Sequence, residues 1–242
     1  MPVNSSKKIL ITNDDGIHSD GLVRLAAVAR DFGEVWVVAP DNERSSMSHS
    51  ITLHDSFELW PCDFPVPDVH AWACTGTPGD CVRIGALNVV PGWPDYLFSG
   101  INYGYNAASD LQYSATVGAA LEGSFQGIHS TAFSEDASPI HEVTDHYLHD
   151  IIADLITRPL KKGQIWNVNF PGCSLAECRG IQWDRKVSDE CFYVDTYEQH
   201  LEPSGRYTCH VIGTRDNRAE EGTDLRAIYD NYISMGLVNN LS

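Results

Sequence analysis

The sequence predicts an α/β protein built on a Rossmann-like, mostly parallel sheet that is flanked by helices. Residues 9–12 form a short apolar segment rich in β-branched side chains, which is typical of a buried parallel strand. Residues 20–31 carry apolar side chains at positions i, i+3, i+4 and i+7, and residues 34–40 form a second apolar segment. A strand, a helix and a strand within about thirty residues form a βαβ unit, so the first two strands should be parallel.

The alternation of strands and helices continues to residue 170. Thr77 followed by Pro78 marks a helix start, because a threonine N-cap and a proline at the first helical position both favour it. Helical periodicity fades after residue 170, and the C-terminal region predicts β-hairpins, as at 207–212. We therefore expect a Rossmann-like core over 1–170 and a β-rich C-terminal extension over 171–242. The expected later elements are strands at 71–74, 96–99, 130–133 and 165–170, and helices at 78–90, 117–126 and 142–157.

The composition restricts the possible partners. The chain has 242 residues, 43% of them hydrophobic, which is enough for one large domain or one domain plus a subdomain. Its formal net charge of −17 argues against binding to duplex nucleic acid or an anionic membrane, where lysine and arginine must replace counterions. A small anionic substrate is still compatible if a metal, backbone N–H groups or a helix N-terminus neutralises it locally.

The cysteines and the N-terminus predict a cytoplasmic protein. Residues 1–8 are polar and resemble no signal peptide, and no apolar run reaches membrane-spanning length. The seven cysteines include no Cys-x-x-Cys pair, which is typical of reduced thiols and argues against a zinc site. No Gly-x-Ser-x-Gly motif is present, so a serine hydrolase of that type is excluded.

Three predicted strands end in oxygen-rich loops, which contain Asp14 and Asp15, Ser45 and Ser46, and Asn102. The carboxyl ends of parallel strands meet at one edge of the sheet. Two carboxylates about 4 Å apart repel by roughly 4 kcal/mol at an effective dielectric of ~20, and solvent, a shared proton or a cation can relieve that repulsion. The ligand types suit Mg²⁺, Mn²⁺ or Ca²⁺. On these residues alone, loops that merely satisfy their own backbone are an equally good interpretation.

A series of motifs, taken together, is more specific than any of these signals. In chain order they are NDDG at 13–16, VAPD at 38–41, HSITL at 49–53, GTP at 76–78, SGIN at 99–102, YSATVGAA at 113–120, NVNFP at 167–171 and EGTD at 221–224. This order resembles the survival protein SurE family over nearly the whole chain. The family consists of metal-dependent phosphatases that act on nucleoside 5'- and 3'-monophosphates.

The resemblance implies roles for particular residues. The metal ligands would be Asp14, Asp15, Ser45 and Asn102, holding one divalent cation per subunit, Mg²⁺ or Mn²⁺. The phosphate and the rest of the substrate would lie against Asn13, Gly16, Asn106, Ser114, Ala115 and Thr116. The residues expected to take part in catalysis are Asp14, Asp15, Asn106, Ser114 and Thr116. The resemblance also implies that the C-terminal hairpin region builds a homodimer or homotetramer.

Several positions depart from the family pattern. Ala115 stands where the family usually has glycine, and a positive φ there would cost about 1–2 kcal/mol. The family's usual Asn-Leu-Gly-Asp-Asp is replaced by residues 106–110, and Ser46 stands where glycine or alanine is common. Water or Asp14 could attack phosphorus, and the absence of an Asp-x-Asp motif favours water. A metal-dependent nucleoside hydrolase and a non-catalytic nucleotide-binding protein are the alternatives.

Overall fold

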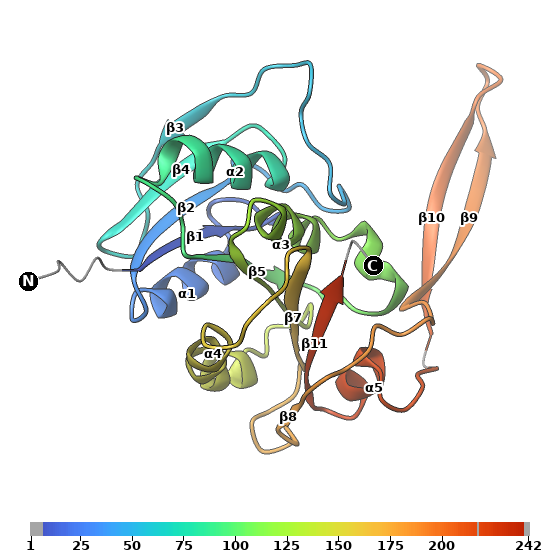
Figure 1. Ribbon diagram of the computed structural model, residues 1–242. Coiled ribbons are helices and arrows are strands. Elements are labelled where there is room, and N and C mark those ends of the chain that lie inside the picture. Colours follow the sequence, from blue (N-terminus) through green and yellow to red (C-terminus); the bar gives the residue numbers. More distant parts are fainter. Residues whose placement is uncertain (1–6, 217, 240–242) are drawn as a thin grey trace, which may run out of the picture.

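The computed structural model, which describes residues 7–216 and 218–239, is organised around one nine-stranded sheet (Figure 1). Its strand order is β3-β4-β2-β1-β5-β6-β7-β11-β8. All neighbours from β4 to β7 are parallel, whereas β3 and β11 pair in antiparallel fashion with β4 and β7. The strands of this sheet are β1 (Lys8–Thr12), β2 (Glu34–Pro40), β3 (Leu59–Pro61), β4 (Val69–Cys74), β5 (Tyr96–Tyr103), β6 (His129–Glu135), β7 (Gln164–Phe170), β8 (Ile181–Gln182) and β11 (Ile233–Asn239).

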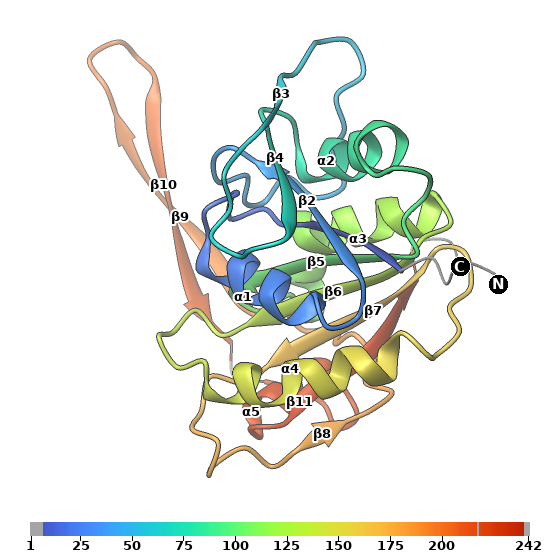
Figure 2. The ribbon, with the colours of Figure 1, turned by 90° about the vertical axis from the view of Figure 1, so that its left-hand side faces the viewer.

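Helices cover both faces of the sheet, as Figure 2 also shows, and this confirms the predicted fold class. Helices α1 (Asp20–Ala29) and α4 (Glu142–Leu155) lie on one face. Helices α2 (Pro78–Ile84) and α3 (Ala115–Phe125) lie on the other. The predicted helix at 78–90 is α2 followed by one π-helical turn, Gly85–Val89.

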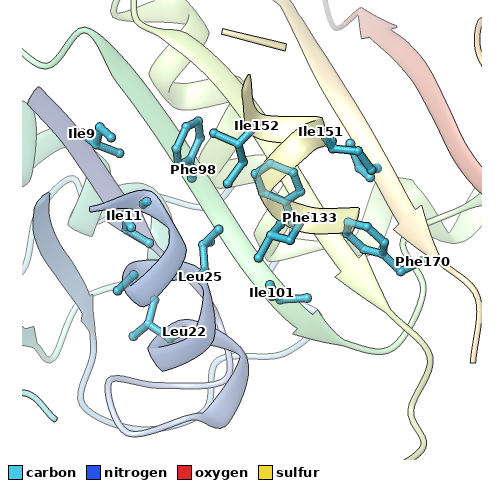
Figure 3. Close-up of a cluster of buried hydrophobic side chains, with 14 of the residues drawn as sticks. Ile9, Ile11, Leu22, Leu25, Phe98, Ile101, Phe133, Ile151, Ile152 and Phe170 are labelled. Carbon is cyan, nitrogen blue, oxygen red and sulfur yellow. The ribbon is translucent and has the colours of Figure 1, made fainter. Parts of the chain in front are cut away.

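The alternation of side chains along β1 divides the core between the two faces. Ile9 and Ile11 belong to the cluster under α1 and α4, whereas Leu10 belongs to the cluster under α2 and α3. The first cluster is the larger one, and Figure 3 shows side chains of α1 and α4 next to those of the strands. The labelled side chains are Ile9, Ile11, Leu22, Leu25, Phe98, Ile101, Phe133, Ile151, Ile152 and Phe170. Strand β1 is therefore buried on both faces, as its apolar sequence predicts.

The C-terminal region contributes both to the main sheet and to a separate hairpin. Strands β9 (Tyr193–Leu201) and β10 (Tyr207–Arg215) form a two-stranded antiparallel sheet of their own, which projects from the body in both views (Figure 1, Figure 2). In contrast, β8 and β11 belong to the nine-stranded sheet. The short helix α5 (Asp224–Tyr229) was not expected from the sequence. The division at residue 170 stays a proposal.

The order of the strands predicts where a ligand can bind. From β1 the chain proceeds outward to β2 and β4 on one side, and then to β5, β6 and β7 on the other. The reversal leaves a crevice beyond the carboxyl ends of β1 and β5, which is the usual ligand position in open α/β sheets. Asp14 and Asp15 follow β1, and Asn102 lies near the end of β5.

Candidate active site

Asp14 lies at the centre of this crevice and is almost completely buried, with 4% of its surface exposed. The Thr116 hydroxyl, at the start of α3, donates a hydrogen bond to the Asp14 carboxylate and lies 3.1 Å from the amide oxygen of Asn102. Asp15 accepts a 3.1 Å hydrogen bond from the backbone N–H of Tyr103. The ends of β1 and β5 and the N-terminus of α3 therefore bring three predicted site side chains together, those of Asp14, Asn102 and Thr116.

The surroundings of the two aspartates oppose their ionisation. Burial raises the pKa of Asp14 to about 7, and the charge of Asp15 adds to this effect, while the Thr116 hydrogen bond lowers it. Burial also raises the pKa of Asp15, and the charges of Glu43 and Glu135 contribute. A divalent cation would neutralise both carboxylates, and hard oxygen donors are the ligands that Mg²⁺ and Mn²⁺ prefer. The donor set therefore fits such an ion.

The residues in 7–216 and 218–239 contain no group of three or more His, Cys, Asp or Glu side chains that could hold a metal. A cation at this site would thus depend on two carboxylates together with neutral oxygens. Ser45 and Asn102 supply such oxygens. In the structure, the Ser45 hydroxyl donates to Glu43 at 2.7 Å, and the Asn102 amide N–H donates to the Gly104 carbonyl oxygen at 2.8 Å.

The loop that carries Ser45 is held against two other parts of the site. The Arg44 N–H donates to the carbonyl oxygen of Asp14 at 2.7 Å, which ties the loop to the end of β1. Further along, the Ser48 N–H donates to the carbonyl oxygen of Tyr113 at 3.0 Å. His49 Nε2 lies 2.9 Å from a carboxylate oxygen of Glu122, which anchors the loop to α3.

Gly118 lets the loop pack directly on α3. A Cβ at Gly118 would lie 2.8 Å from the carbonyl carbon of Ser48 and 2.9 Å from the Cα of His49.

We expect Gly118→Ala to displace the loop and to lower the free energy of unfolding by about 1–3 kcal/mol, the usual cost of overpacking. Because Ser45 would move with the loop, Mn²⁺ should also bind more weakly. Thermal unfolding and calorimetric titration test this, and unchanged stability and affinity would contradict the packing.

The N-terminus of α3 is the place where the sequence predicts an anion site. Ser114 is the N-cap, and its hydroxyl accepts a 3.1 Å hydrogen bond from the Val117 N–H. Ala115 is the first residue of the helix, so it does not need a positive φ and the alanine is accommodated without strain. Among the positions that depart from the family pattern, the left-handed conformation instead occurs at Ala108, with φ of +55°, and at Ser46, with φ of +59°. Both are positions where the family pattern has glycine or a small residue.

Asn106 is fixed by polar residues from the ends of β6 and β7. Its side-chain N–H donates to the Ser134 hydroxyl at 2.8 Å, and its backbone N–H donates to the side-chain oxygen of Asn169 at 2.9 Å. Asn167 and Asn169 donate to its carbonyl oxygen at 2.9 and 3.1 Å. Sequence reasoning gave these three partners no role, although two asparagines on alternate positions of an apolar strand are a signal of a buried polar network.

These side chains surround a cavity of about 260 Å³ at the carboxyl edge of the sheet. Five residues predicted from the sequence line it, namely Asp14, Ser45, Asn102, Asn106 and Ser114. The other lining residues are Ser46, Tyr103, Asp110, Tyr113, Tyr193 and Asp195. Ser46 belongs to the oxygen-rich loop predicted after β2, whereas the other five were not predicted as site residues.

The other predicted residues lie around this cavity rather than in its lining. Asp15 borders a neighbouring cavity of about 300 Å³. The Asn13 amide donates to the Gly16 carbonyl oxygen at 2.9 Å and to the Ser19 hydroxyl at 2.7 Å, which shapes the turn after β1. Gly16 has φ of +98°, a conformation that favours glycine. Ala115 and Thr116 lie behind Ser114 in the first turn of α3.

A known protein family matches most of this chain. The model of the family described as "Survival protein SurE" matches residues 9–191. The chain belongs to the SurE family. It is 38% identical to the 5'-nucleotidase SurE of Synechococcus sp. (strain JA-3-3Ab), with 94% of this chain and 89% of that protein covered. It is 35% identical to the 5'-nucleotidase SurE of Cytophaga hutchinsonii, with 96% and 90% covered.

A solved structure shows the same fold. The crystal structure of the SurE protein from Aquifex aeolicus matches with a TM-score of 0.82 and 31% identity, over 97% of this chain and 94% of that one. The family predicted from the motifs is confirmed. Within the described residues of this SurE chain, no helix has both the length and the apolar character needed to cross a bilayer.

Proposed function

We propose that this SurE chain is a nucleotidase, a phosphomonoesterase that hydrolyses nucleoside 5'- and 3'-monophosphates to nucleoside and phosphate. One observation supports this most strongly: a single cavity joins a buried carboxylate to the N-terminus of a helix. The carboxylate suits a cation and the helix terminus suits a phosphate, as a phosphatase requires. The relatives named 5'-nucleotidase support the same substrate class.

We propose one Mg²⁺ or Mn²⁺ ion per subunit, held by Asp14, Asp15, Ser45 and Asn102. When bound, such an ion polarises a phosphate oxygen and lowers the pKa of a coordinated water. The chain's own residues orient the phosphate. The Ser114 hydroxyl and the free N–H groups of the first turn of α3 would bind its oxygens, and Asn106, which also lines the cavity, would contact them. Thr116 would keep the Asp14 carboxylate aimed at the cation.

A panel of nucleotides tests this function. Purified protein is incubated with 5'- and 3'-monophosphates of each base, with EDTA or with added Mg²⁺ or Mn²⁺, and both free phosphate and free base are measured. We expect metal-dependent release of phosphate and nucleoside. Release of free base would instead indicate a nucleoside hydrolase, and binding without any product would indicate a nucleotide-binding protein.

We also propose that the β9–β10 hairpin joins copies of the chain into a homodimer or homotetramer. A two-stranded ribbon is marginally stable alone, and apolar side chains are exposed along it. Tyr197 and Val211 face each other across the strands and are 65% and 61% exposed.

The double variant Tyr197→Asp with Val211→Asp is therefore expected to be monomeric, because charges on this apolar surface oppose its burial against a second copy. Light scattering after gel filtration measures the mass, and Ser204→Asp at the hairpin tip is the control for an added charge. A monomeric wild-type protein, or a double variant with the wild-type mass, would contradict the proposal.

For the compartment, we propose the cytoplasm. All seven cysteines are free thiols in the structure, and five of them are buried or half-buried within the core clusters. Free thiols in this number are typical of a reducing environment.

A further inference from the structure

Two acidic residues line the active-site cavity without belonging to the expected metal site. Asp110 lies in the 3-10 helix Ala108–Tyr113, and Asp195 lies near the start of β9. We refer to Asp110 and Asp195 as the acidic rim. Among the described residues that line this cavity, none is lysine, arginine or histidine. The cavity lining therefore carries negative charge beyond that of Asp14.

The fold fixes the position of the acidic rim. The backbone N–H of Tyr193 interacts with the Asp110 carboxylate, and both residues line the cavity, so the 3-10 helix and the base of the hairpin meet there. Asp195 is paired in register with Gly213 of β10, and a Cβ at Gly213 would lie 3.3 Å from its carboxylate oxygen. The glycine thus leaves room for this carboxylate above the strand. Burial raises the pKa of Asp110, and the charge of Asp195 adds to this effect, as expected of two nearby acids.

One positively charged side chain nearby, that of Arg215, lines a different cavity. This cavity, of about 290 Å³, shares Asp110 and Tyr193 with the first one. The Arg215 guanidinium lies over the Phe192 ring, 4.8 Å from its centroid, and 5.3 Å from the centroid of Tyr229. It is therefore held against these aromatic rings.

The negative charge of the cavity lining affects the part of the substrate that remains after the phosphate is removed. The α3 N-terminus would bind the phosphate that is removed, so the remainder of the substrate must extend past the other lining residues. The nucleoside of a monophosphate is neutral, and the exposed rings of Tyr103, Tyr113 and Tyr193 offer it aromatic contacts. A second phosphate would bring additional negative charge toward the acidic rim.

We infer that Asp110 and Asp195 select substrates by charge: the cavity accepts a phosphomonoester whose remaining part is neutral and rejects one that carries further phosphate groups. This inference rests on the proposed nucleotidase function and specifies its substrate class. Asp195 is the clearer of the two positions for a test, because it is exposed on the hairpin and its replacement should leave the core intact.

The test compares AMP with ADP, which share base and ribose and differ by one phosphate. The ratio of kcat/KM for AMP to kcat/KM for ADP is measured at fixed free Mg²⁺ for the wild type, Asp195→Asn and Glu198→Gln. Glu198 lies on the same strand, outside the cavity lining, and its substitution removes the same charge. We expect Asp195→Asn to lower the ratio about 5-fold, the effect of one unit charge at close range in a water-like medium, and Glu198→Gln to leave it unchanged.

Ionic strength provides a second readout that a purely structural role would not change. Raising the salt from 50 to 500 mM should lower the ratio for the wild type, because salt screens the repulsion, and should lower it less for Asp195→Asn. The dissociation constants of AMP and ADP are measured calorimetrically on the same three proteins. The preference for AMP over ADP in binding should change as the preference in kcat/KM does. Binding reports charge selection even if no phosphate is released. The inference would be overturned if the AMP-to-ADP ratio of Asp195→Asn lay within twofold of the wild-type ratio, both for kcat/KM and for the dissociation constants. Loss of AMP hydrolysis with a preserved binding difference would count against the nucleotidase function alone.

Discussion

Replacing Asp14 by asparagine is expected to reduce metal-dependent phosphate release by about a thousandfold or more. Asparagine has the same shape and can still accept the Thr116 hydrogen bond, but it lacks the charge that would hold the cation. A metal ion contributes several kcal/mol of transition-state stabilisation, which corresponds to this factor in rate. The measurement is kcat/KM for AMP with saturating Mn²⁺. Asp150→Asn, at an exposed acid on α4, is the matched control and should keep full activity.

The same substitution should stabilise the metal-free protein. In the folded state Asp14 holds its proton up to a pH of about 7, whereas an unfolded aspartate releases it near its usual pKa of 3.8. The folded state therefore binds more protons between these pH values, and the free energy of unfolding falls as pH rises from about 4 to 7, by up to roughly 4 kcal/mol. The neutral amide of the variant carries no such cost. Without metal at pH 8, we expect the variant to unfold about 5–10 °C above the wild type.

Two further conditions should remove this difference. At pH 4 the wild-type carboxyl is protonated in the folded state, so the two unfolding temperatures should converge. At pH 8 with saturating Mn²⁺, only the wild type should gain stability from binding. A variant that is less stable than the wild type in EDTA at pH 8 would show that Asp14 is not held as an unfavourably buried charge.

The affinity for Mn²⁺ is expected to fall about 30-fold between pH 8 and pH 5.5. The cation requires the ionised form of Asp14, and with a pKa of about 7 this carboxyl is almost entirely protonated at the lower pH. Below pH 7, binding should therefore release close to one proton from Asp14. Calorimetric titrations in buffers with different ionisation enthalpies measure both the affinity and the proton release. An affinity independent of pH over this range would contradict the assignment of Asp14 as a ligand.

The fold could be predicted from local sequence signals because its core elements carry them. The apolar segment before Asp14 became the central strand β1, and Thr77 became the N-cap of α2, where it forms a capping box with Asp80. The expected strand ends meet at one edge of the sheet because their strands are parallel neighbours. Periodicity and caps act within a few residues, so they can be recognised without knowing the rest of the fold.

The features that could not be predicted depend on contacts between distant segments. Strand β11 pairs with β7 across more than sixty residues, although it lies within 171–242, which was expected to be an extension of the core. The buried Asp224 carboxylate fixes the start of the 3-10 helix by accepting a 3.0 Å hydrogen bond from the Ala108 N–H. The family pattern directed attention to Ala115, yet in this segment it is Ala108 that has the left-handed conformation, because backbone conformation follows from such tertiary contacts.

The most direct test of the central claim is the release of phosphate from AMP by protein stripped with EDTA and then titrated with Mn²⁺. We expect no release in EDTA, recovery that saturates at one Mn²⁺ per chain in the wild type, and no recovery in Asp14→Asn. Phosphate release that persists in EDTA, or that Mn²⁺ restores equally in Asp14→Asn, would contradict a cation-dependent phosphatase site at the end of β1.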